Sequence, residues 1–490
     1  MMQITIKLMH ITTEPRPVEQ IETDALVVPL FEGSPDARFG NDELFSSGEA
    51  AGKEMEITLL HRPQGTAAKR VVFAGAGKRD SFGPTVMRRT VGAAVRHLKS
   101  KGVKRATLAA GAAYEGAEFT AAAVEGAILA DFEPDRYKTG DDKKNLDSFA
   151  VAGSAPGMAE AAGRGCVLAE AQNYARSLVN EPANRLSPSG MAAASKQMAA
   201  EAALECEVLD QAAMQALGMG SLLGVAQGSA EPPCLIVLRY RPARAASVAH
   251  LGLVGKGVTF DTGGISIKPA DGMEKMKYDM AGGAAMIGAM RAIAQLKPAV
   301  AVTAFVPCVE NMPGSRAQRP GDIVTAMSGK TIEVINTDAE GRLILADALT
   351  YARRQGCTHL VDAATLTGAI VVALGHLNVG LFTNNDALRD RVLAASKAEG
   401  ERMWPMPLDD DYKEYLKSAF ADVANVGGRW GGAVTAAMFL KEFSEETPWV
   451  HLDIAGTAWL DDSKPYMAKG PTGLPVRTLV RLAEEWKETA

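Results

Sequence analysis

The sequence predicts an α/β protein of two domains, and three observations lead to this expectation. Strand-like and helix-like segments alternate along the chain, the strand-like segments of its second part are short and almost wholly apolar, and 490 residues are enough for more than one hydrophobic core. We expect a first α/β domain over residues 1–155, a linking helix over 156–178, and a second α/β domain over 179–490 that holds a mixed, mostly parallel sheet.

In the first domain, short apolar runs predict strands, and longer runs with helical spacing predict helices. The expected strands are 4–8, 25–30 and 70–74, and the expected helices are 86–98 and 119–129. The stretch 131–147 is rich in charged residues and contains Pro134 and Gly140, which indicates an exposed loop. Small and apolar residues at helical spacing then predict the linking helix.

The second domain contains strand-like runs that are apolar on both faces, as in a sheet covered by helices on both sides. These expected strands are 234–238, 251–254, 301–306, 359–363 and 450–454. Leu345, Ala348 and Leu349 share one face of an expected helix, which Gly356 is expected to end. In such sheets a functional site lies at the carboxyl ends of the strands.

Composition and charge argue against several classes of protein. Hydrophobic residues make up 47% and charged residues 22% of the chain, the balance of an ordinary globular protein, and the net charge of -6 argues against a dedicated nucleic-acid-binding protein. The chain shows no signal-peptide pattern and no apolar run of the ~20 residues that span a membrane. Its five cysteines are widely spaced without a CxxC pair, which is typical of free thiols in a reducing compartment. We expect a cytoplasmic protein.

Three segments place acidic and basic residues among glycines and apolar residues next to expected strands: 255–269, 276–280 and 336–343. Four carboxylates in them can converge at neighbouring strand ends: Asp261, Asp279, Asp338 and Glu340. Like charges at close range repel unless protons or cations neutralise them, and two divalent cations balance four carboxylates. The sequence has no HExxH and no paired His or Cys ligands, so an oxygen-rich site for Mn²⁺, Mg²⁺ or Zn²⁺ is expected.

Each of these features alone has an ordinary structural interpretation. An Asp-x-Glu pair such as Asp338 and Glu340 most often lies in a surface turn, and a lone lysine near a strand end is usually solvated. Glycine pairs such as Gly263 and Gly264 often only form turns. The joint occurrence of these features favours a functional site.

The segment Asn336-Thr-Asp-Ala-Glu-Gly-Arg-Leu343 resembles the signature octapeptide of the leucine aminopeptidase family, the cytosol aminopeptidases among the metallopeptidases. The resemblance covers nearly all of residues 175–485. Further matching motifs are Leu178-Val-Asn-Glu-Pro-Ala-Asn184, Glu310-Asn-Met-Pro313, Arg319-Pro-Gly-Asp322 and His451-Leu-Asp-Ile-Ala-Gly456. The first 150 residues match only in general pattern, and the resemblance implies a macro-domain-like first domain before a catalytic metallopeptidase domain.

The resemblance implies a role for each residue at a matching position. Asp261 and Glu340 are expected to bridge two metal ions, Asp338 to complete one of the metal sites, and Asp279 with the amine of Lys256 to complete the other. Two more residues are expected to be catalytic. Lys268 would remain charged and face the substrate, and Arg342 would hold a bicarbonate ion.

The resemblance also implies an activity: hydrolysis of the N-terminal peptide bond of peptides and amino-acid amides by a hydroxide that two metals activate. Lys268 would stabilise the oxyanion, and the bicarbonate would act as general base. Residues expected to line the pocket for the first side chain are Met276, Thr365, Gly368, Ala455 and Ala458. The family often has methionine where this chain has Ala458, which implies a pocket that is roomier or differently shaped, with apolar residues such as Leu or Met as the default preference.

A homohexamer is implied by the resemblance alone. Two other functions stay open on the same scaffold: a dipeptidase of the Cys-Gly type, and a second role in DNA binding or regulation. A catalytically inactive scaffold is disfavoured because every expected ligand position is intact.

Overall fold

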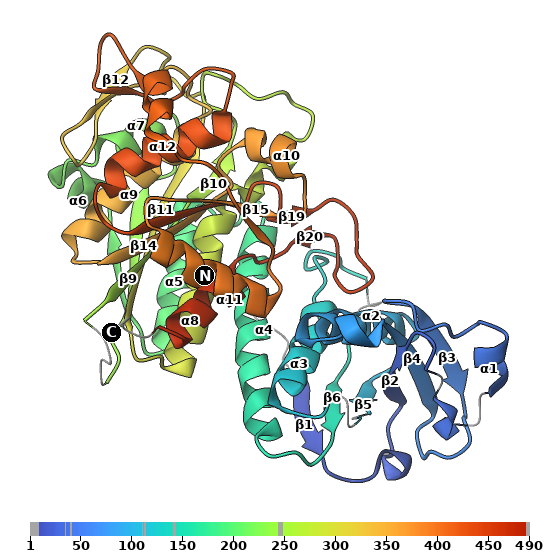
Figure 1. Ribbon diagram of the computed structural model, residues 1–490. Helices are drawn as coiled ribbons and strands as arrows, with labels where there is room; N and C mark the ends of the chain where they lie inside the picture. Colours follow the sequence, from blue (N-terminus) through green and yellow to red (C-terminus); the bar gives the residue numbers. More distant parts are fainter. Residues whose placement is uncertain are drawn as a thin grey trace. The chain divides into compact units, whose positions relative to one another are not determined.

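The computed structural model describes residues 9–34, 36–39, 42–109, 111, 114–140, 144–243 and 248–486. The strand expected over 4–8 lies outside these residues. Contacts within the chain divide it into two compact units (Figure 1). One contains the described residues from Met9 to Asn173 together with Leu460–Gly470, and the other contains Tyr174–Trp459 and the described residues from Pro471 to Trp486. The division of the sequence at residues 155 and 178 stays a prediction.

The first unit is built on a six-stranded sheet with the order β1-β6-β5-β2-β4-β3, in which only the edge strand β3 is antiparallel to its neighbour. Its strands are β1 His10–Glu14, β2 Ala25–Phe31, β3 Ile57–His61, β4 Arg70–Gly77, β5 Arg105–Leu108 and β6 Ser148–Ala152. Its α-helices are α1 Asp42–Ser46, α2 Pro84–Ser100 and α3 Ala117–Asp131, and its 3-10 helices are η1 Val18–Gln20, η2 Ala37–Phe39 and η3 Arg79–Ser81. Helices α2 and α3 pack against each other at Gly126, where a Cβ atom would lie 2.2 Å from the Arg88 carbonyl oxygen.

The second unit contains a mixed sheet with the order β16-β15-β18-β14-β9-β11-β8-β7, and β10 pairs with β11. Its strands are β7 Glu205–Leu209, β8 Cys234–Tyr240, β9 His250–Gly255, β10 Gly257–Asp261, β11 Ala301–Asn311, β14 His359–Ala364, β15 Val379–Thr383, β16 Met403–Pro405 and β18 Trp449–Asp453. The central strands β18, β14, β9, β11 and β10 are parallel, whereas β15–β18, β11–β8 and β8–β7 are antiparallel pairs. The expected mixed, mostly parallel sheet is confirmed.

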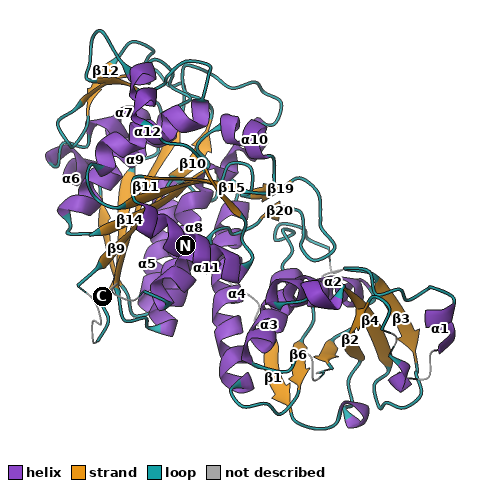
Figure 2. Cartoon of the chain, viewed as in Figure 1, coloured by secondary structure: helices purple, strands orange, loops and turns teal. Residues whose placement is uncertain are grey.

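Helices cover this sheet, as Figure 2 shows in purple around the orange strands. They are α5 Pro188–Glu201, α6 Gln211–Ala216, α7 Gly220–Ala226, α8 Ala281–Leu296, α9 Glu340–Arg354, α10 Gly368–Leu374, α11 Asp386–Glu399, α12 Gly432–Ser444 and α13 Val476–Glu484. Helix α4, Met158–Asn180, begins in the first unit and ends in the second. Helix α13 packs on α8 and α11, whereas α9 packs on α7 and α12, and both α8 and α9 contact β9 and β11. None of the described helices is long and apolar enough to cross a membrane.

The remaining elements are short. They are the strands β12 Ile323–Thr325, β13 Thr331–Glu333, β17 Val423–Ala424, β19 Trp459–Leu460 and β20 Gly470–Pro471, and the 3-10 helices η4 Met273–Met280 and η5 Asp410–Leu416. Glu340 is the first residue of α9 and follows the turn that contains Asp338. A carboxylate in the first helical turn interacts favourably with the positive end of the helix dipole.

The parallel strands bring chemically active residues to one edge of the sheet. Strand β9 leads directly into Lys256, β10 ends at Asp261, β11 at Asn311 and β18 at Asp453. Because parallel strands share the direction of their carboxyl ends, these residues lie at the same edge. The carboxyl ends of neighbouring parallel strands therefore define the candidate site.

Candidate metal centre

Lys256 is held at the centre of the second unit by its backbone. Its amide nitrogen donates to the Ala363 carbonyl oxygen at 3.1 Å, and its carbonyl oxygen accepts from the Gly283 nitrogen at 2.7 Å. This close approach requires glycine at position 282, because a Cβ atom there would lie 2.0 Å from the Ala363 oxygen. The main chain at Lys256 is thus fixed between β14 and the first turn of α8.

The side chain of Lys256 is buried among acceptors. Its Nζ atom lies 2.8 Å from the Asp279 carboxylate and 2.8 Å from the Glu340 carboxylate, and donates to the Thr365 carbonyl oxygen at 3.0 Å. Gly341 leaves room for this arrangement, because a Cβ atom there would lie 2.8 Å from Nζ. Burial alone would lower the pKa of Lys256, but the surrounding carboxylates outweigh it and raise the pKa above its usual value.

Lys268 approaches the same carboxylates from a glycine-containing loop. Its Nζ atom lies 2.8 Å from an Asp261 oxygen and also pairs with Asp338. The loop turns back at Gly263, which has a φ of +86°, and the Lys268 amide donates to the Thr262 carbonyl at 2.9 Å. Partial burial would lower the pKa of Lys268, but the nearby carboxylates, Asp261 foremost, raise it.

Three carboxylates form a compact cluster. One oxygen from each of Asp261, Asp338 and Glu340 lies within 4.8 Å of the others. Asp279 joins this group through Lys256, which contacts both Asp279 and Glu340. Burial raises the pKa values of Asp279, Glu340 and Asp338, and neighbouring negative charges add to the rise. The cluster is therefore a buried acidic site whose negative charge must be offset by bound protons or by nearby cations.

Arg342 lies in the first turn of α9 and is also buried, with 6% of its surface exposed. One terminal nitrogen donates to the Asn425 carbonyl oxygen at 2.7 Å. Its Nε atom has no hydrogen-bond partner among the residues that the structure describes. Burial lowers the pKa of Arg342 to about 10, although the Glu340 and Asp453 carboxylates oppose this shift. A buried guanidinium with an unused donor suits an anion.

The expected pocket residues have different positions. Thr365 is buried and donates its hydroxyl to the Asp279 carboxylate at 2.8 Å, which puts it beside the acidic site. Met276 lies on η4, half-buried, and Gly368 begins α10 and is exposed. Ala455 is half-buried, whereas Ala458 is buried, with 2% of its surface exposed.

Asp453 joins two of the expected pocket segments. Its carboxylate accepts from the Leu366 nitrogen at 3.2 Å, the Thr367 hydroxyl at 2.7 Å and the Ala455 nitrogen at 3.2 Å. The loop after β14 and the loop after β18 are thereby held to the same carboxylate. Sequence reasoning did not single out Asp453, although its place directly after four buried strand residues was a usable signal.

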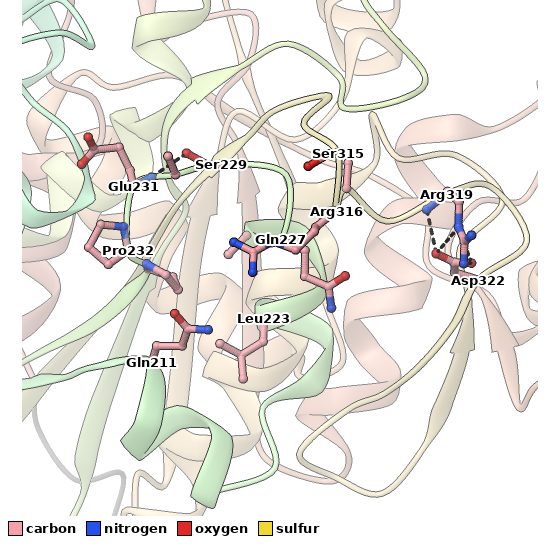
Figure 3. Close-up of a pocket in the computed structure, with 14 residues that line it drawn as sticks. Gln211, Leu223, Gln227, Ser229, Glu231, Pro232, Ser315, Arg316, Arg319 and Asp322 are labelled. Atoms are coloured by element: carbon pink, nitrogen blue, oxygen red, sulfur yellow. Dashed lines mark hydrogen bonds and ion pairs between the residues drawn. The ribbon is translucent and has the colours of Figure 1, made fainter.

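A separate cavity of about 650 Å³ lies elsewhere in the second unit (Figure 3). Its lining residues include Gln211, Gln227, Glu231 and Arg316, and none of the clustered carboxylates or lysines belongs to it. The sticks in Figure 3 show polar side chains spread around its rim, with the ion pair of Arg319 and Asp322 at one side. The acidic cluster is thus distinct from this cavity.

Comparisons with known proteins define the class as metal-dependent aminopeptidases. The catalytic-domain model of the cytosol aminopeptidase family matches residues 173–480, and the N-terminal-domain model of the same family matches residues 37–141. The chain belongs to the cytosol aminopeptidase family. It is therefore an aminopeptidase, a hydrolase that acts on peptides.

Relatives with similar sequences cover almost the whole chain. A protein of Solibacter usitatus named "Probable cytosol aminopeptidase" is 74% identical over 98% of this chain and 100% of its own length. A protein of Koribacter versatilis with the same name is 50% identical over 95% of this chain and 98% of its own length.

Solved structures show the same two-domain fold. A mutant of tomato leucine aminopeptidase has a TM-score of 0.89 and 35% identity, over 99% of this chain and 98% of its own. The bottromycin maturation enzyme BotP in complex with Mn has a TM-score of 0.86 and 35% identity, over 94% of this chain and 99% of its own.

Proposed function

We propose that this chain is a dinuclear metalloaminopeptidase that releases the first residue of peptides and of amino-acid amides. The observation that carries the proposal is the buried cluster in which oxygens of Asp261, Asp338 and Glu340 lie within 4.8 Å of one another. Hard oxygen ligands at this density suit divalent cations such as Mn²⁺, Zn²⁺ or Mg²⁺. The Mn complex of the related BotP supports the choice of Mn²⁺.

The residues present fit a pair of metal ions. In this structure the lysine ammonium groups neutralise part of the buried charge. Burial, together with the neighbouring carboxylates, nevertheless raises the pKa of Asp279 and of Glu340. Asp261, Asp338 and Glu340 would hold the two ions together with Asp279 and the amine of Lys256, with Asp338 serving one ion and Asp279 and Lys256 the other. Lys256 must lose its proton to serve as a ligand, so metal binding releases that proton.

Bound metals would supply Lewis acidity and lower the pKa of a coordinated water. The chain's own residues supply the rest. Lys268, partly exposed beside Asp261 and Asp338, can face the scissile carbonyl and stabilise the negative charge that develops on its oxygen. Arg342, with its unused Nε donor, can hold a bicarbonate ion that accepts and returns a proton.

The substrate's first side chain would lie against Met276, Thr365, Gly368, Ala455 and Ala458. The hydroxyl of Thr365 already donates to the Asp279 carboxylate, so its methyl group would be the part left to contact the substrate. The small residues Gly368, Ala455 and Ala458, together with the apolar Met276, suit apolar side chains such as those of Leu or Met. The name that its relatives carry supports a cytoplasmic location.

We further propose a homohexamer. The proposal rests on the family resemblance, and large apolar side chains that are exposed in the single chain would be available for contacts between subunits. They include Val372, Leu377, Trp404, Phe420 and Trp430. Sedimentation that finds fully active single chains would contradict the assembly.

The function is tested with leucine amide as substrate and with protein depleted of metal by a chelator. We expect activity to vanish on depletion and to return with Mn²⁺ or Zn²⁺. Elemental analysis of the reloaded protein should give two metal ions per chain. Full activity in a sample shown by elemental analysis to be metal-free would refute the proposal.

A further inference from the structure

Asn311 is a buried amide placed at the centre of the acidic cluster. It is the last residue of β11, it is 2% exposed, and it lies opposite Asp261 in the parallel pairing of β10 with β11. All residues of β11 from Val302 to Val309 are also buried, and most of them are apolar. An amide at this strand end therefore serves something other than the hydrophobic core.

The Asn311 side chain donates to all three segments that form the cluster. Its Nδ2 atom lies 2.8 Å from an Asp261 carboxylate oxygen, 3.0 Å from the Thr337 carbonyl oxygen and 3.5 Å from a Glu340 carboxylate oxygen. All three partners are acceptors, so the orientation of the amide is determined by its surroundings. Thr337 directly precedes Asp338, the third member of the cluster.

The backbone of Asn311 extends this connection to the loop that carries Lys268. Its carbonyl oxygen accepts from both the nitrogen and the hydroxyl of Thr262, at 3.0 and 2.8 Å. The hydroxyl of Thr337 in turn donates to the Gly263 carbonyl oxygen at 2.7 Å. The end of β10, the loop after it and the turn before α9 are thus tied to one another through Asn311.

We propose that Asn311 is a positioning residue of the metal centre, and that its amide sets the spacing of the Asp261, Asp338 and Glu340 oxygens. This inference rests on the proposed function and adds a residue to it. A neutral donor can hold carboxylates together without adding the positive charge that would compete with metal ions. Groups that orient metal ligands in this way typically change metal affinity by about 10- to 100-fold when they are replaced.

The test uses Mn²⁺ binding to the full chain, with Asn311→Leu and Asn311→Ala as variants. Leucine keeps the shape of asparagine without its donors, and alanine removes the group altogether. Asn384→Leu is the matched control: Asn384 also bonds carbonyl oxygens, those of Glu445 and Thr447, but at the amino end of β18, away from the carboxyl ends. Free Mn²⁺ is measured by electron paramagnetic resonance during titration of metal-depleted protein, and the spectrum of bound Mn²⁺ reports whether two ions are magnetically coupled.

We expect the wild type and Asn384→Leu to bind two Mn²⁺ ions with a coupled spectrum. The two Asn311 variants should bind at least one ion about 10- to 100-fold more weakly and should lose the coupling at equal occupancy. Circular dichroism checks that each variant is folded. Folded Asn311 variants with wild-type affinity and spectrum would overturn the inference while leaving the proposed function intact. A wild type that binds no Mn²⁺, Zn²⁺ or Mg²⁺ would overturn both.

Discussion

The ammonium group of Lys256 lies 2.8 Å from the Glu340 carboxylate, although the two residues are far apart in the sequence. Lys256 follows β9 and Glu340 opens α9, and both elements pack together in the second unit. The contact places a cation inside the acidic cluster. The two lysines of the site are chemically different, because Lys256 is enclosed whereas Lys268 is partly exposed. Their replacement should therefore have different consequences.

Lys256→Ala should lower the metal content of the purified enzyme. The side chain is enclosed by Asp279, Glu340 and the Thr365 carbonyl, so its loss removes a proposed ligand and disturbs two others. Excess Mn²⁺ should restore part of the activity, because the remaining carboxylates still attract the ion. Metal content by elemental analysis and activity against added metal check this. Wild-type metal content after identical purification would show that Lys256 is not a ligand.

Lys268→Ala should leave the metal content nearly unchanged and lower kcat. Loss of one preorganised donor to a developing oxyanion costs about 10²- to 10³-fold in rate. Steady-state kinetics on leucine amide, run in parallel with Lys256→Ala, separates the two roles. If KM rose while kcat held, Lys268 would bind the substrate equally in its ground and transition states. Equal metal loss in both variants would mean that their roles are wrongly assigned.

Gly341→Ala should weaken metal binding without unfolding the protein. The added Cβ atom would lie 2.7 Å from Lys256 Cε, and Lys256 cannot move freely because three partners hold its Nζ atom. Alanine otherwise favours a helix over glycine by about 1 kcal/mol. Gly163→Ala is the matched control, since this exposed helical glycine has open space around its Cβ position. Thermal midpoints and Mn²⁺ affinity are compared, and equal affinity in the two variants would contradict the prediction.

Asp347 should make the stability of the chain depend on pH. Burial raises its pKa to about 7, although the backbone N–H groups of Met327 and Leu222 donate to it at 2.7 and 2.8 Å. Because this pKa exceeds the ordinary value of 3.8, the folded chain holds the proton more tightly than the unfolded chain. The proton on Asp347 therefore stabilises the folded chain. Its contribution to the free energy of unfolding is complete below about pH 4 and is lost as the pH rises to about 7.

Asp347→Asn should remove this dependence and carry a cost of its own. The NH₂ group of the new amide would face a backbone N–H group that has lost its acceptor, which should lower the free energy of unfolding by about 1–3 kcal/mol. The difference in thermal midpoint between the wild type and Asp347→Asn should therefore be larger at about pH 5 than at about pH 8. Asp462→Asn, at an exposed position, serves as control. A difference that stays constant between the two pH values would argue against a raised pKa.

Much of the architecture could be predicted from local patterns. Apolar runs identified β2, β4, β8, β9, β14 and β18 to within a few residues, because a buried strand needs apolar side chains on both faces. Strand β11 was the partial exception. The run expected over 301–306 continues to Asn311, since Pro307 and the polar Glu310 interrupt its pattern but not its pairing with β10 and β8.

The sequence by itself determined the α/β class, the family and the residues that carry charge in the site, because periodicity and motifs are properties of neighbouring residues. Only the tertiary structure decided which atoms meet. The sheet order places β9 between β14 and β11, and this order brings Lys256 to Asp279 and Glu340 and Asn311 to Asp261. It also decided that Leu460–Gly470 belongs to the first unit. These contacts depend on how elements far apart in the sequence pack against one another. The free energy of that packing cannot be read from local patterns of residues.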